Sequence, residues 1–218
     1  MPGKIKEMFS KMSINTIIFD FGGVIFHPPK PGNLRRMQKI FRIKIDPDVL
    51  EMLEKKEGSQ LIREMCLGEI PEEEMWMTVA KKLGVKPWLY RWFHRGLTSN
   101  RHLNKPLVRF LMELSQDHKI GILSNAGDQT RGTIEDILHL DRYVDEIIIS
   151  AEEKIIKPDR RIYQIAVERL DAIPETSLFL DDQLVNVQAA RDFGMKAVQF
   201  ISNEQAIPEM NAYLDGRR

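Results

Sequence analysis

Cysteine is almost absent from this sequence, which has Cys66 alone among its 218 residues. A single cysteine excludes a disulfide within the chain and favours a reducing compartment. No stretch of about 18 apolar residues is present to span a bilayer. Residues 1–12 carry lysines but no apolar segment that leads to a cleavage site, so a signal peptide is not expected. We therefore expect a cytoplasmic protein with no membrane association.

An excess of charge of either sign is also lacking, because 32 Lys and Arg residues balance 32 Asp and Glu residues. A balanced chain carries no basic footprint for nucleic acid or for an anionic membrane surface. A small molecule is therefore the expected partner. No feature of the composition predicts an oligomeric state.

Five short runs rich in β-branched residues and phenylalanine are the strongest structural signal that is present. Near-continuous apolar runs of this length predict strands buried on both faces, as in parallel sheets. Residues at helical spacing separate them, so the sequence predicts an α/β fold with a doubly wound, Rossmann-like sheet. The runs are 14–19, 119–123, 145–150, 177–181 and 196–200, and the helical faces include Leu107, Phe110, Leu111 and Leu114, then Ile134, Ile137 and Leu138, then Ile162, Ile165 and Ala166.

The interval between the first two predicted strands is too long for a simple crossover. Residues 20–118 comprise 99 positions, whereas a crossover needs only about a dozen or more. Segments rich in Pro, Gly and Asn at 27–33 and 96–106 have the composition of hinges. Between them, signatures such as Asp46 before Pro47 predict helices only. The predicted organisation is an N-terminal tail at 1–12, an α/β core at 13–26 and 104–218, and a small helical cap at 27–103.

Polar residues follow four of the predicted strands. Ligands of open α/β sheets bind beyond the carboxyl ends of the strands, so these residues are expected to converge on one site. Taken singly, an aspartate pair is often a helix N-cap and a lysine before proline is often a solvated loop residue. Their placement after successive strands favours a functional role. The residues are Asp20 and Gly22 after the first strand, Ser124, Asn125 and Ala126 after the second, Lys157 past the third, and Asp181 and Asp182 at the fourth.

This combination of groups suits phosphoryl transfer. An attack by Asp20 on phosphorus would form an aspartyl-phosphate and split one difficult step into two. Carboxylate and carbonyl oxygens are the ligands that Mg²⁺ prefers, and a metal or a lysine is needed to keep neighbouring aspartates ionised. Lys157, with donors from Ser124, Asn125 and the Ala126 amide, would neutralise the phosphoryl oxygens as charge spreads over them.

The four segments resemble, in order, the four motifs of the haloacid dehalogenase-like (HAD) hydrolase superfamily. FDFGGV resembles the first motif, LSNAG the second, KPDRRIY the third and FLDDQLVNVQAARDFG the fourth. The last of these, together with LGEI at 67–70, is similar to the subgroup that contains the phosphatase domain of soluble epoxide hydrolases and bacterial glucose-1-phosphate phosphatases. The resemblance covers residues 14–201. It implies a Mg²⁺-dependent phosphatase acting on a small phosphorylated metabolite, with a sugar phosphate as one candidate.

The resemblance also implies a role for each matching position. Asp20 matches the nucleophile and a metal ligand, and the carbonyl of Gly22 matches a second ligand. Asp182 matches the metal ligand of the fourth motif, with Asp181 directly bound to the metal or one shell further out. The remaining matches are Ser124 and Asn125 with phosphate binding, Lys157 with the lysine that holds nucleophile and phosphate, and Asn186 with support of the fourth motif.

One position departs from the pattern of most phosphatases in the superfamily. A second aspartate normally stands two residues after the nucleophile as general acid and base, but here that residue is Gly22. Loss of general acid catalysis typically costs about 10²–10⁴-fold. A good leaving group, such as an anomeric sugar hydroxyl, needs less protonation. Two alternatives stay open, namely a binding or regulatory module that has lost turnover and, ranked lower, a 2-haloacid dehalogenase.

Two groups of aromatic residues mark the predicted cap. Trp76 shares a helical face with Val79, Ala80 and Leu83 and is interpreted as cap core. Four further aromatics lie close together, and we interpret them as core packing, with a substrate lid as the alternative. They are Trp88, Tyr90, Trp92 and Phe93.

Overall fold

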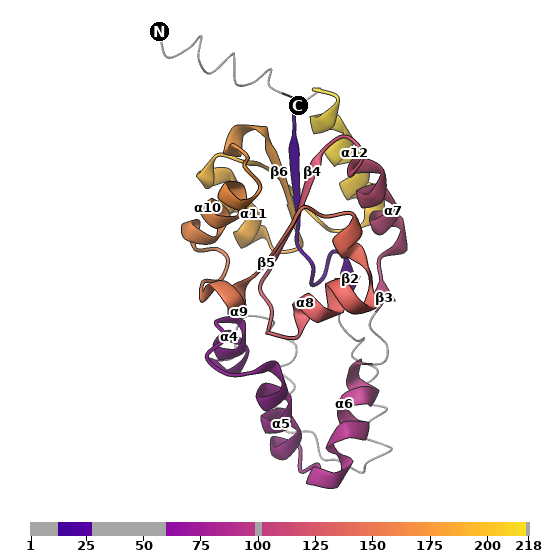
Figure 1. Cartoon of the computed structure of the whole chain (residues 1–218), viewed down its shortest axis with the longest axis vertical. Helices are drawn as coiled ribbons and strands as arrows, with labels where there is room; N and C mark the ends of the chain where they lie inside the picture. Colours follow the sequence, from indigo (N-terminus) through magenta and orange to yellow (C-terminus); the bar gives the residue numbers. More distant parts are fainter. Residues whose placement is uncertain (1–12, 28–59, 99–101, 217–218) are drawn as a thin grey trace.

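The computed structural model describes residues 13–27, 60–98 and 102–216 of the chain. A five-stranded parallel sheet lies at its centre (Figure 1), with all five strands where the sequence predicts them. The central strand, β1, pairs with β4 on one side and with β6 on the other. All five carboxyl ends therefore meet at one edge of the sheet, where the polar residues were expected to converge. The order across the sheet is β5 (Glu146–Ile149), β4 (Lys119–Ser124), β1 (Thr16–Phe19), β6 (Ser177–Asp181) and β7 (Lys196–Gln199).

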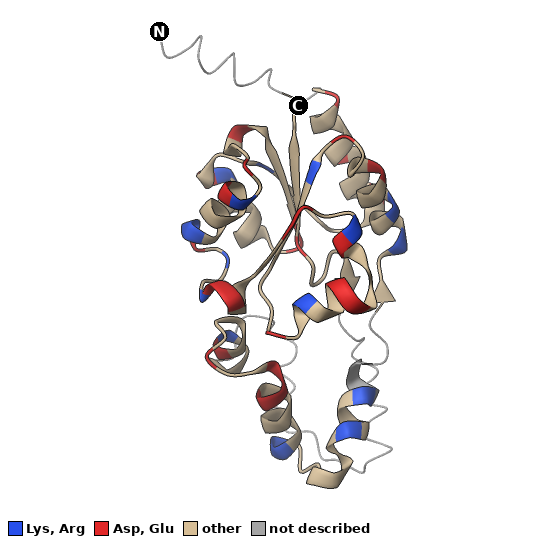
Figure 2. Cartoon of the chain, viewed as in Figure 1, with Lys and Arg blue, Asp and Glu red and all other residues tan. Residues whose placement is uncertain are grey.

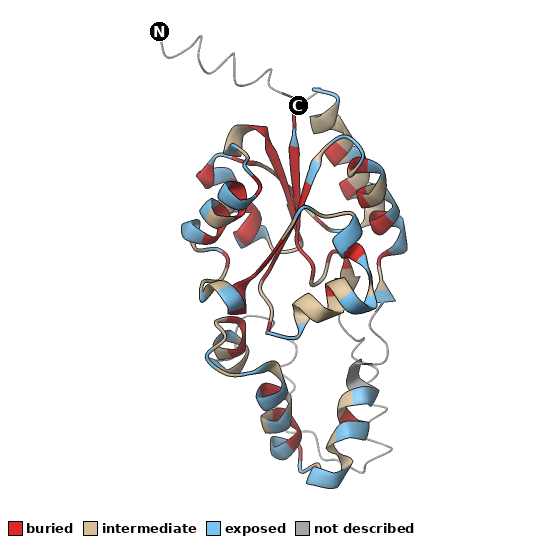
Figure 3. Ribbon diagram, viewed as in Figure 1, coloured by how far each residue is buried: buried red, intermediate tan, exposed pale blue. Residues whose placement is uncertain are grey.

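Helices cover both faces of this sheet. Along β1, Ile17 and Phe19 point into one hydrophobic cluster and Ile18 into the other, as the period-two alternation of a strand requires. The strands are buried from both sides (Figure 3), which confirms the doubly wound fold. The first cluster includes residues of α7 (Lys105–Leu114) and α12 (Asn203–Leu214), and the second includes residues of α10 (Arg160–Arg169) and α11 (Leu184–Phe193).

One predicted helical face is wrong in part. Ile134 is buried, but Ile137 is 70% exposed. The short helix α8 (Thr130–Gly132) continues as a π-helical turn, η2 (Thr133–Ile137). A π turn changes the residue spacing, so positions three apart no longer share a face. The other short elements of the core are η3 (Leu140–Arg142), α9 (Ser150–Glu153) and η4 (Pro174–Thr176).

Between β1 and β4, the described residues form a separate helical cluster beyond the carboxyl ends of the strands (Figure 1). It comprises α4 (Gln60–Cys66), α5 (Glu72–Lys82), η1 (Pro87–Leu89) and α6 (Tyr90–Thr98). Its own small core contains Met65, Cys66, Met75, Val79, Ala80, Leu83 and Phe93, with Trp76 packed against it. The predicted cap boundaries stay predictions, because residues 28–59 and 99–101, with the Asp46–Pro47 helix start, lie outside the described part of the chain.

The interpretation of residues 88–93 as core is wrong for two of them. Phe93 is fully buried, whereas Trp88 and Trp92 are 72% and 71% exposed. Trp88 lies in η1 (Pro87–Leu89), and Trp92 lies in α6 (Tyr90–Thr98). Phe93 follows Trp92 and is rotated by about 100° around the helix axis, which turns it into the small core of the insertion. No helix among the described residues is long and apolar enough to cross a membrane.

The two predicted hinges contain a pairing that the sequence did not indicate. Strand β2 (Phe26–His27) runs antiparallel to β3 (His102–Leu103), so His27 lies opposite His102. Asn104, the residue directly after β3, is buried, and its side-chain amide donates to the carbonyl of Val24 at 3.0 Å. The segments that enter and leave the helical insertion are therefore held side by side by this strand pair and by Asn104.

Candidate active site

Backbone register brings the predicted site residues together at the carboxyl edge of the sheet. Phe19 of β1 pairs with Leu180 of β6, and the Asp20 amide donates to the carbonyl of Leu180 at 2.8 Å. Asp20 and Asp181 therefore follow paired positions on neighbouring strands. Ser124 ends β4 on the other side of β1 and is buried. Lys157 reaches the same place from the loop after α9.

Lys157 is the centre of this cluster. Its ammonium group donates to Asp20 Oδ1 at 2.8 Å, to Asp181 Oδ2 at 2.6 Å and to the carbonyl of Leu123 at 3.0 Å. The side chain is only 1% exposed. Burial alone would lower the pKa of Lys157, but the two carboxylates and their hydrogen bonds outweigh it and raise the pKa above its usual value. Lys157 is therefore a fixed, charged group that holds two aspartates.

Asp20 lies in an environment with more negative charge than its partner lysine can offset. Burial is the largest influence and raises the pKa of Asp20 to about 7. Lys157 lowers it, while the carboxylates of Asp181 and, more weakly, Asp182 raise it. Three neighbouring carboxylates thus share one ammonium group that contacts two of them, and a further cation would favour the ionised form of Asp20.

The three aspartates are close enough to hold that cation. One ligand oxygen from each of Asp20, Asp181 and Asp182 lies within 4.8 Å of the others. Among the described residues, the buried side-chain oxygen of Asn186 has no hydrogen-bond partner. A set of hard oxygen ligands on one side of a buried site fits Mg²⁺. Figure 2 shows acidic residues at this edge of the sheet.

Protein groups already occupy both carboxylate oxygens of Asp181. Oδ1 accepts from the backbone amide of Gln183 at 2.8 Å and from Asn186 Nδ2 at 3.1 Å. Oδ2 accepts from Lys157 Nζ at 2.6 Å and from the same Asn186 amide at 3.2 Å. Asn186 therefore supports the fourth motif, and Asp181 is locked in place by its neighbours.

The predicted phosphate-binding loop uses some of its polar groups on the protein itself. Asn125 accepts from the Lys157 amide at 2.8 Å and donates to the Lys157 carbonyl at 3.0 Å. The Ala126 amide donates to Ser150 Oγ at 3.0 Å. The side chain of Asn125 thus positions Lys157, and the amide of Ala126 is engaged within the protein.

Gly22 lies in a tight turn that begins after Asp20. The Phe26 amide donates to the carbonyl of Phe21 at 2.8 Å, and Gly23 closes the turn with a φ of 100° that disfavours any other residue. A Cβ placed on Gly22 would have no atom within 4 Å. The space around Gly22 therefore does not exclude a residue with a Cβ at this position.

Sequence reasoning missed two buried hydroxyl groups that support the site. Tyr163 donates to the carbonyl of Asn186 at 3.0 Å, and its ring packs edge-on against Phe179. The Ser150 hydroxyl accepts a hydrogen bond from the Ala126 amide and donates one to the carbonyl of Cys66 in the helical insertion. Ser150 directly follows β5, so the rule that predicts Asp20 and Lys157 applies to it as well, but the apolar run at 145–150 includes it as the last residue of the predicted strand.

Comparisons with known proteins agree with this geometry. The sequence pattern of the hydrolase family described as haloacid dehalogenase-like hydrolase matches residues 14–194. Bifunctional epoxide hydrolase 2 of Mus musculus is 23% identical over 231 aligned positions, covering 91% of this chain and 38% of that protein. A phosphorylated carbohydrates phosphatase of Thermotoga maritima is 28% identical over 95 positions, covering 43% of this chain and 44% of that protein. The chain thus spans less than half the length of these curated relatives.

Solved structures show the same fold. A HAD-like family hydrolase from Porphyromonas gingivalis has a TM-score of 0.73 at 23% identity, covering 93% of this chain and 98% of that chain. A HAD family enzyme from Bacteroides thetaiotaomicron, solved with magnesium and inorganic phosphate, has a TM-score of 0.71 at 18% identity. The match covers 88% of this chain and 96% of that chain. Because the family pattern spans most of the sequence, this chain belongs to the haloacid dehalogenase-like hydrolase family.

Proposed function

We propose that this protein is a Mg²⁺-dependent phosphatase that hydrolyses a small phosphorylated metabolite through an aspartyl-phosphate on Asp20. The contact of Lys157 with both Asp20 and Asp181, beside Asp182, carries the proposal. A buried lysine between two carboxylates, together with a bound cation, favours their ionised forms, as a nucleophile and a metal site require. The relative from Thermotoga maritima that is named as a phosphatase supports the same reaction class.

The metal would be held by Asp20, Asp182 and the carbonyl of Gly22. We assign Asp181 to positioning, because its two oxygens already accept hydrogen bonds from Lys157, Asn186 and Gln183. When bound, Mg²⁺ supplies positive charge beside the phosphoryl oxygens and orients them.

Asp20 performs the covalent chemistry. Lys157 holds Oδ1, and we assign Oδ2 as the oxygen that attacks phosphorus. The new Asp20 O–P bond forms as the bond from phosphorus to the leaving oxygen breaks, and that oxygen takes up a proton from solvent water. Water then attacks the same phosphorus, which releases inorganic phosphate and returns Asp20 to a carboxylate. Lys157 and the hydroxyl of Ser124 stabilise the negative charge of the phosphoryl group in both steps.

Gly22 restricts which substrates are hydrolysed well. Without a carboxylic acid at this position, the leaving oxygen receives less help with protonation. We therefore propose a leaving group that is stable as an anion, such as the anomeric hydroxyl of a sugar. A preference for anomeric phosphates over ordinary alkyl phosphates is the expected result, and equal rates on both would contradict this proposal.

The helical insertion would act as a cap over the site. Its described helices α4 to α6 lie beyond the carboxyl edge of the sheet (Figure 1), where they can limit the access of water to the phosphoryl group. We propose that residues 27–103 form this cap and that a cytoplasmic pool supplies the substrate.

Two alternatives have weaker support. A 2-haloacid dehalogenase needs no metal, so the approach of Asp20, Asp181 and Asp182 within 4.8 Å would have no purpose. A binding module without turnover is favoured only by Gly22. The intact contacts of Lys157 with Asp20 and Asp181 argue against such a module.

Phosphate release from a panel of phosphorylated metabolites tests the proposal. We expect release by the wild type with Mg²⁺, and none with a chelator or in Asp20→Asn. Asp159→Asn is a matched control, because Asp159 is two residues from Lys157 but pairs with Arg161. Release by Asp20→Asn would refute the nucleophile, and no release by the wild type would favour the binding module.

A further inference from the structure

A short cap segment, residues 66–72, is held between the two core loops that build the candidate active site. On one side it rests on α9. The Lys154 ammonium donates to the carbonyl of Gly68 at 2.7 Å, and a side chain on Gly68 would collide with the carbonyl of Ala151. Gly68 has a φ of 62°, so glycine is required here for both shape and space. This side of the segment is therefore fitted closely to the core.

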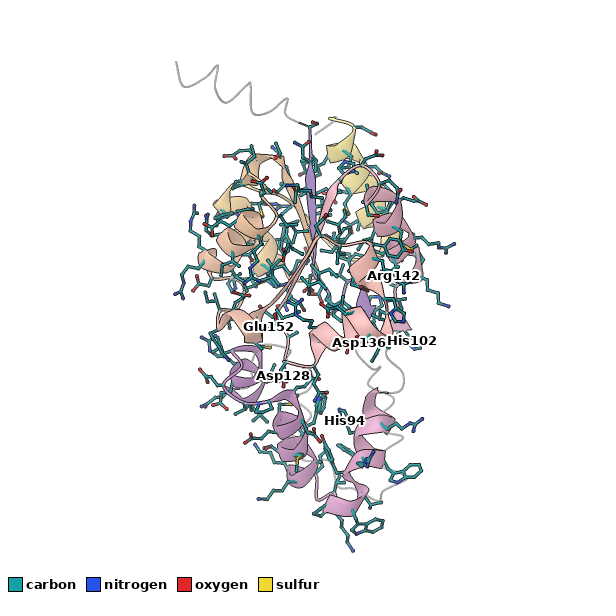
Figure 4. The ribbon with its side chains drawn as sticks, viewed as in Figure 1. His94, His102, Asp128, Asp136, Arg142 and Glu152 are labelled. Carbon is teal, nitrogen blue, oxygen red and sulfur yellow. The ribbon has the colours of Figure 1, made fainter. Side chains whose placement is uncertain are left out.

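On its other side, the segment meets the loop that follows β4. The Glu72 amide donates to Asp128 Oδ1 at 2.9 Å. A Cβ on Gly127 would lie 2.9 Å from Cβ of Glu72 and 3.2 Å from Cγ of Met65. Figure 4 labels Asp128, which belongs to the loop after β4 and lies beside the start of α5, and Glu152, which belongs to α9. Residues 66–72 thus contact both loops at once.

The Ser150 hydroxyl joins the three segments. Ser150 is fully buried, accepts from the Ala126 amide at 3.0 Å and donates to the carbonyl of Cys66 at 2.6 Å. A hydroxyl carries one proton, so a chain of hydrogen bonds runs from the phosphate-binding loop through Ser150 to the last residue of α4. The carbonyl of Ala126 lies 3.3 Å from the same hydroxyl and offers a second acceptor when the contact with Cys66 is lost.

We propose that Ser150 is a positioning residue that couples docking of the cap segment 66–72 to the geometry of the phosphate-binding loop. The coupling rests on the proposed function, since the loop at 124–126 is where the phosphoryl group would bind. With the cap docked, the Ser150 hydroxyl donates a hydrogen bond to the Cys66 carbonyl and accepts one from the Ala126 amide. With the cap displaced, the hydroxyl turns to donate to the Ala126 carbonyl, so that the amide and the carbonyl of this one residue both bind Ser150.

This exchange of acceptors makes phosphate binding and cap docking mutually dependent. When the Ser150 hydroxyl changes its acceptor from the Cys66 carbonyl to the Ala126 carbonyl, the backbone directly after Ser124 and Asn125 shifts. By linkage, whatever tightens phosphate binding must also tighten the contact of residues 66–72, and by the same factor. One hydrogen bond sets the scale of the effect at about three- to tenfold.

Ser150→Ala is the first test, and Ser177→Ala is its matched control. Ser177 is equally buried and donates to the carbonyl of Ile173 at 2.8 Å, at the amino end of β6. Both variants lose one buried hydroxyl, so a general loss of stability is common to both. Inorganic phosphate binding with Mg²⁺, measured by titration, is expected to weaken about three- to tenfold in Ser150→Ala and to stay unchanged in Ser177→Ala. Equal affinities in the two variants would overturn the proposal.

A second test perturbs the cap segment without touching the phosphate-binding loop. Lys154→Met removes the ammonium group that holds the Gly68 carbonyl and leaves the Ser150 contacts intact. We expect it to weaken phosphate binding in the wild-type background and to have no effect in the Ser150→Ala background. Equal effects in both backgrounds would show that Ser150 does not transmit the change.

Hydrogen exchange separates a failure of this inference from a failure of the proposed function. Amide exchange at residues 66–72 is measured on the wild type, Ser150→Ala and Ser177→Ala, with Mg²⁺ and beryllium fluoride. Slower exchange in the wild type and in Ser177→Ala, but not in Ser150→Ala, supports the coupling even if no tested phosphate ester is hydrolysed. The same slowing in all three proteins contradicts the coupling, whether or not the panel reveals turnover.

Discussion

The core and the helical insertion of this protein are built in different ways. At the carboxyl edge of the sheet, charged side chains meet each other, with Lys157 Nζ 2.6 Å from Asp181 and 2.8 Å from Asp20. Where the insertion meets the core, the partners are largely backbone groups, such as the carbonyls of Cys66 and Gly68. In the proposed mechanism the reacting groups are thus side chains fixed by the core, whereas the insertion contacts the core through separate hydrogen bonds to its backbone.

The largest expected effect is in the core. Asp20→Asn removes the attacking oxygen but keeps the size of the side chain, so turnover should fall by at least about 10³-fold. Circular dichroism and the melting temperature are expected to stay close to wild type, because Asn keeps the volume and can still accept from Lys157. A collapse of the fold would mean that Asp20 has a structural role in place of a chemical one.

Lys157→Met should be the most destabilising of the changes considered. It leaves Asp20 and Asp181 buried without their cation, and removal of one partner from a buried ion pair typically costs about 3–5 kcal/mol. Lys154→Met is the control, since its ammonium binds a carbonyl at the surface. Urea denaturation measures the free energy of unfolding of both variants and of the wild type. A cost below about 1 kcal/mol for Lys157→Met would show that the buried pair is not what holds the site together.

Metal binding sharpens the distinction between Asp181 and Asp182. At a Mg²⁺ concentration of about 100 times its Kd, linkage stabilises the folded state by about 2.7 kcal/mol. We expect Mg²⁺ to raise the melting temperature of the wild type and to have little effect on Asp182→Asn. An equal shift in both proteins would exclude Asp182 as a ligand and return that role to Asp181.

Gly22→Asp tests whether the missing acid limits the rate. The added side chain meets no atom within 4 Å at its Cβ, so the variant should fold normally. On alkyl phosphates, turnover should rise by about tenfold, a part of the ~10²–10⁴-fold that a well-placed acid supplies. On substrates with good leaving groups, such as p-nitrophenyl phosphate, the change should be small. A uniform loss of activity on both classes would contradict this explanation of Gly22.

The smallest effect is expected at the surface of the insertion. Trp92→Ala removes a side chain that is 71% exposed, whereas Phe93→Ala removes one that is fully buried. We expect a change in unfolding free energy within about 0.5 kcal/mol for the first and about 3–5 kcal/mol for the second. A large loss for Trp92→Ala would show that the ring packs against part of the chain in solution.

The sequence was sufficient for the parts that depend on local pattern. Buried strands are continuous apolar runs, and a strand itself places the residues at and directly after its carboxyl end, so the positions of Asp20, Ser124 and Asp181 could be predicted. Ile137 was misassigned because a π turn has no clear sequence signal. The pairing of His27 with His102 and the role of Ser150 depend on segments more than 70 residues apart, which no local pattern contains.

Detection of the covalent intermediate tests the central claim most directly. The wild type is mixed with Mg²⁺ and the best substrate of the panel, quenched in acid within one turnover, and its peptides are examined by mass spectrometry. We predict a phosphoryl group on the peptide that contains Asp20, which disappears when the reaction is allowed to finish. Turnover without any label on Asp20, or a label on another residue, would contradict the assignment of Asp20 as the nucleophile.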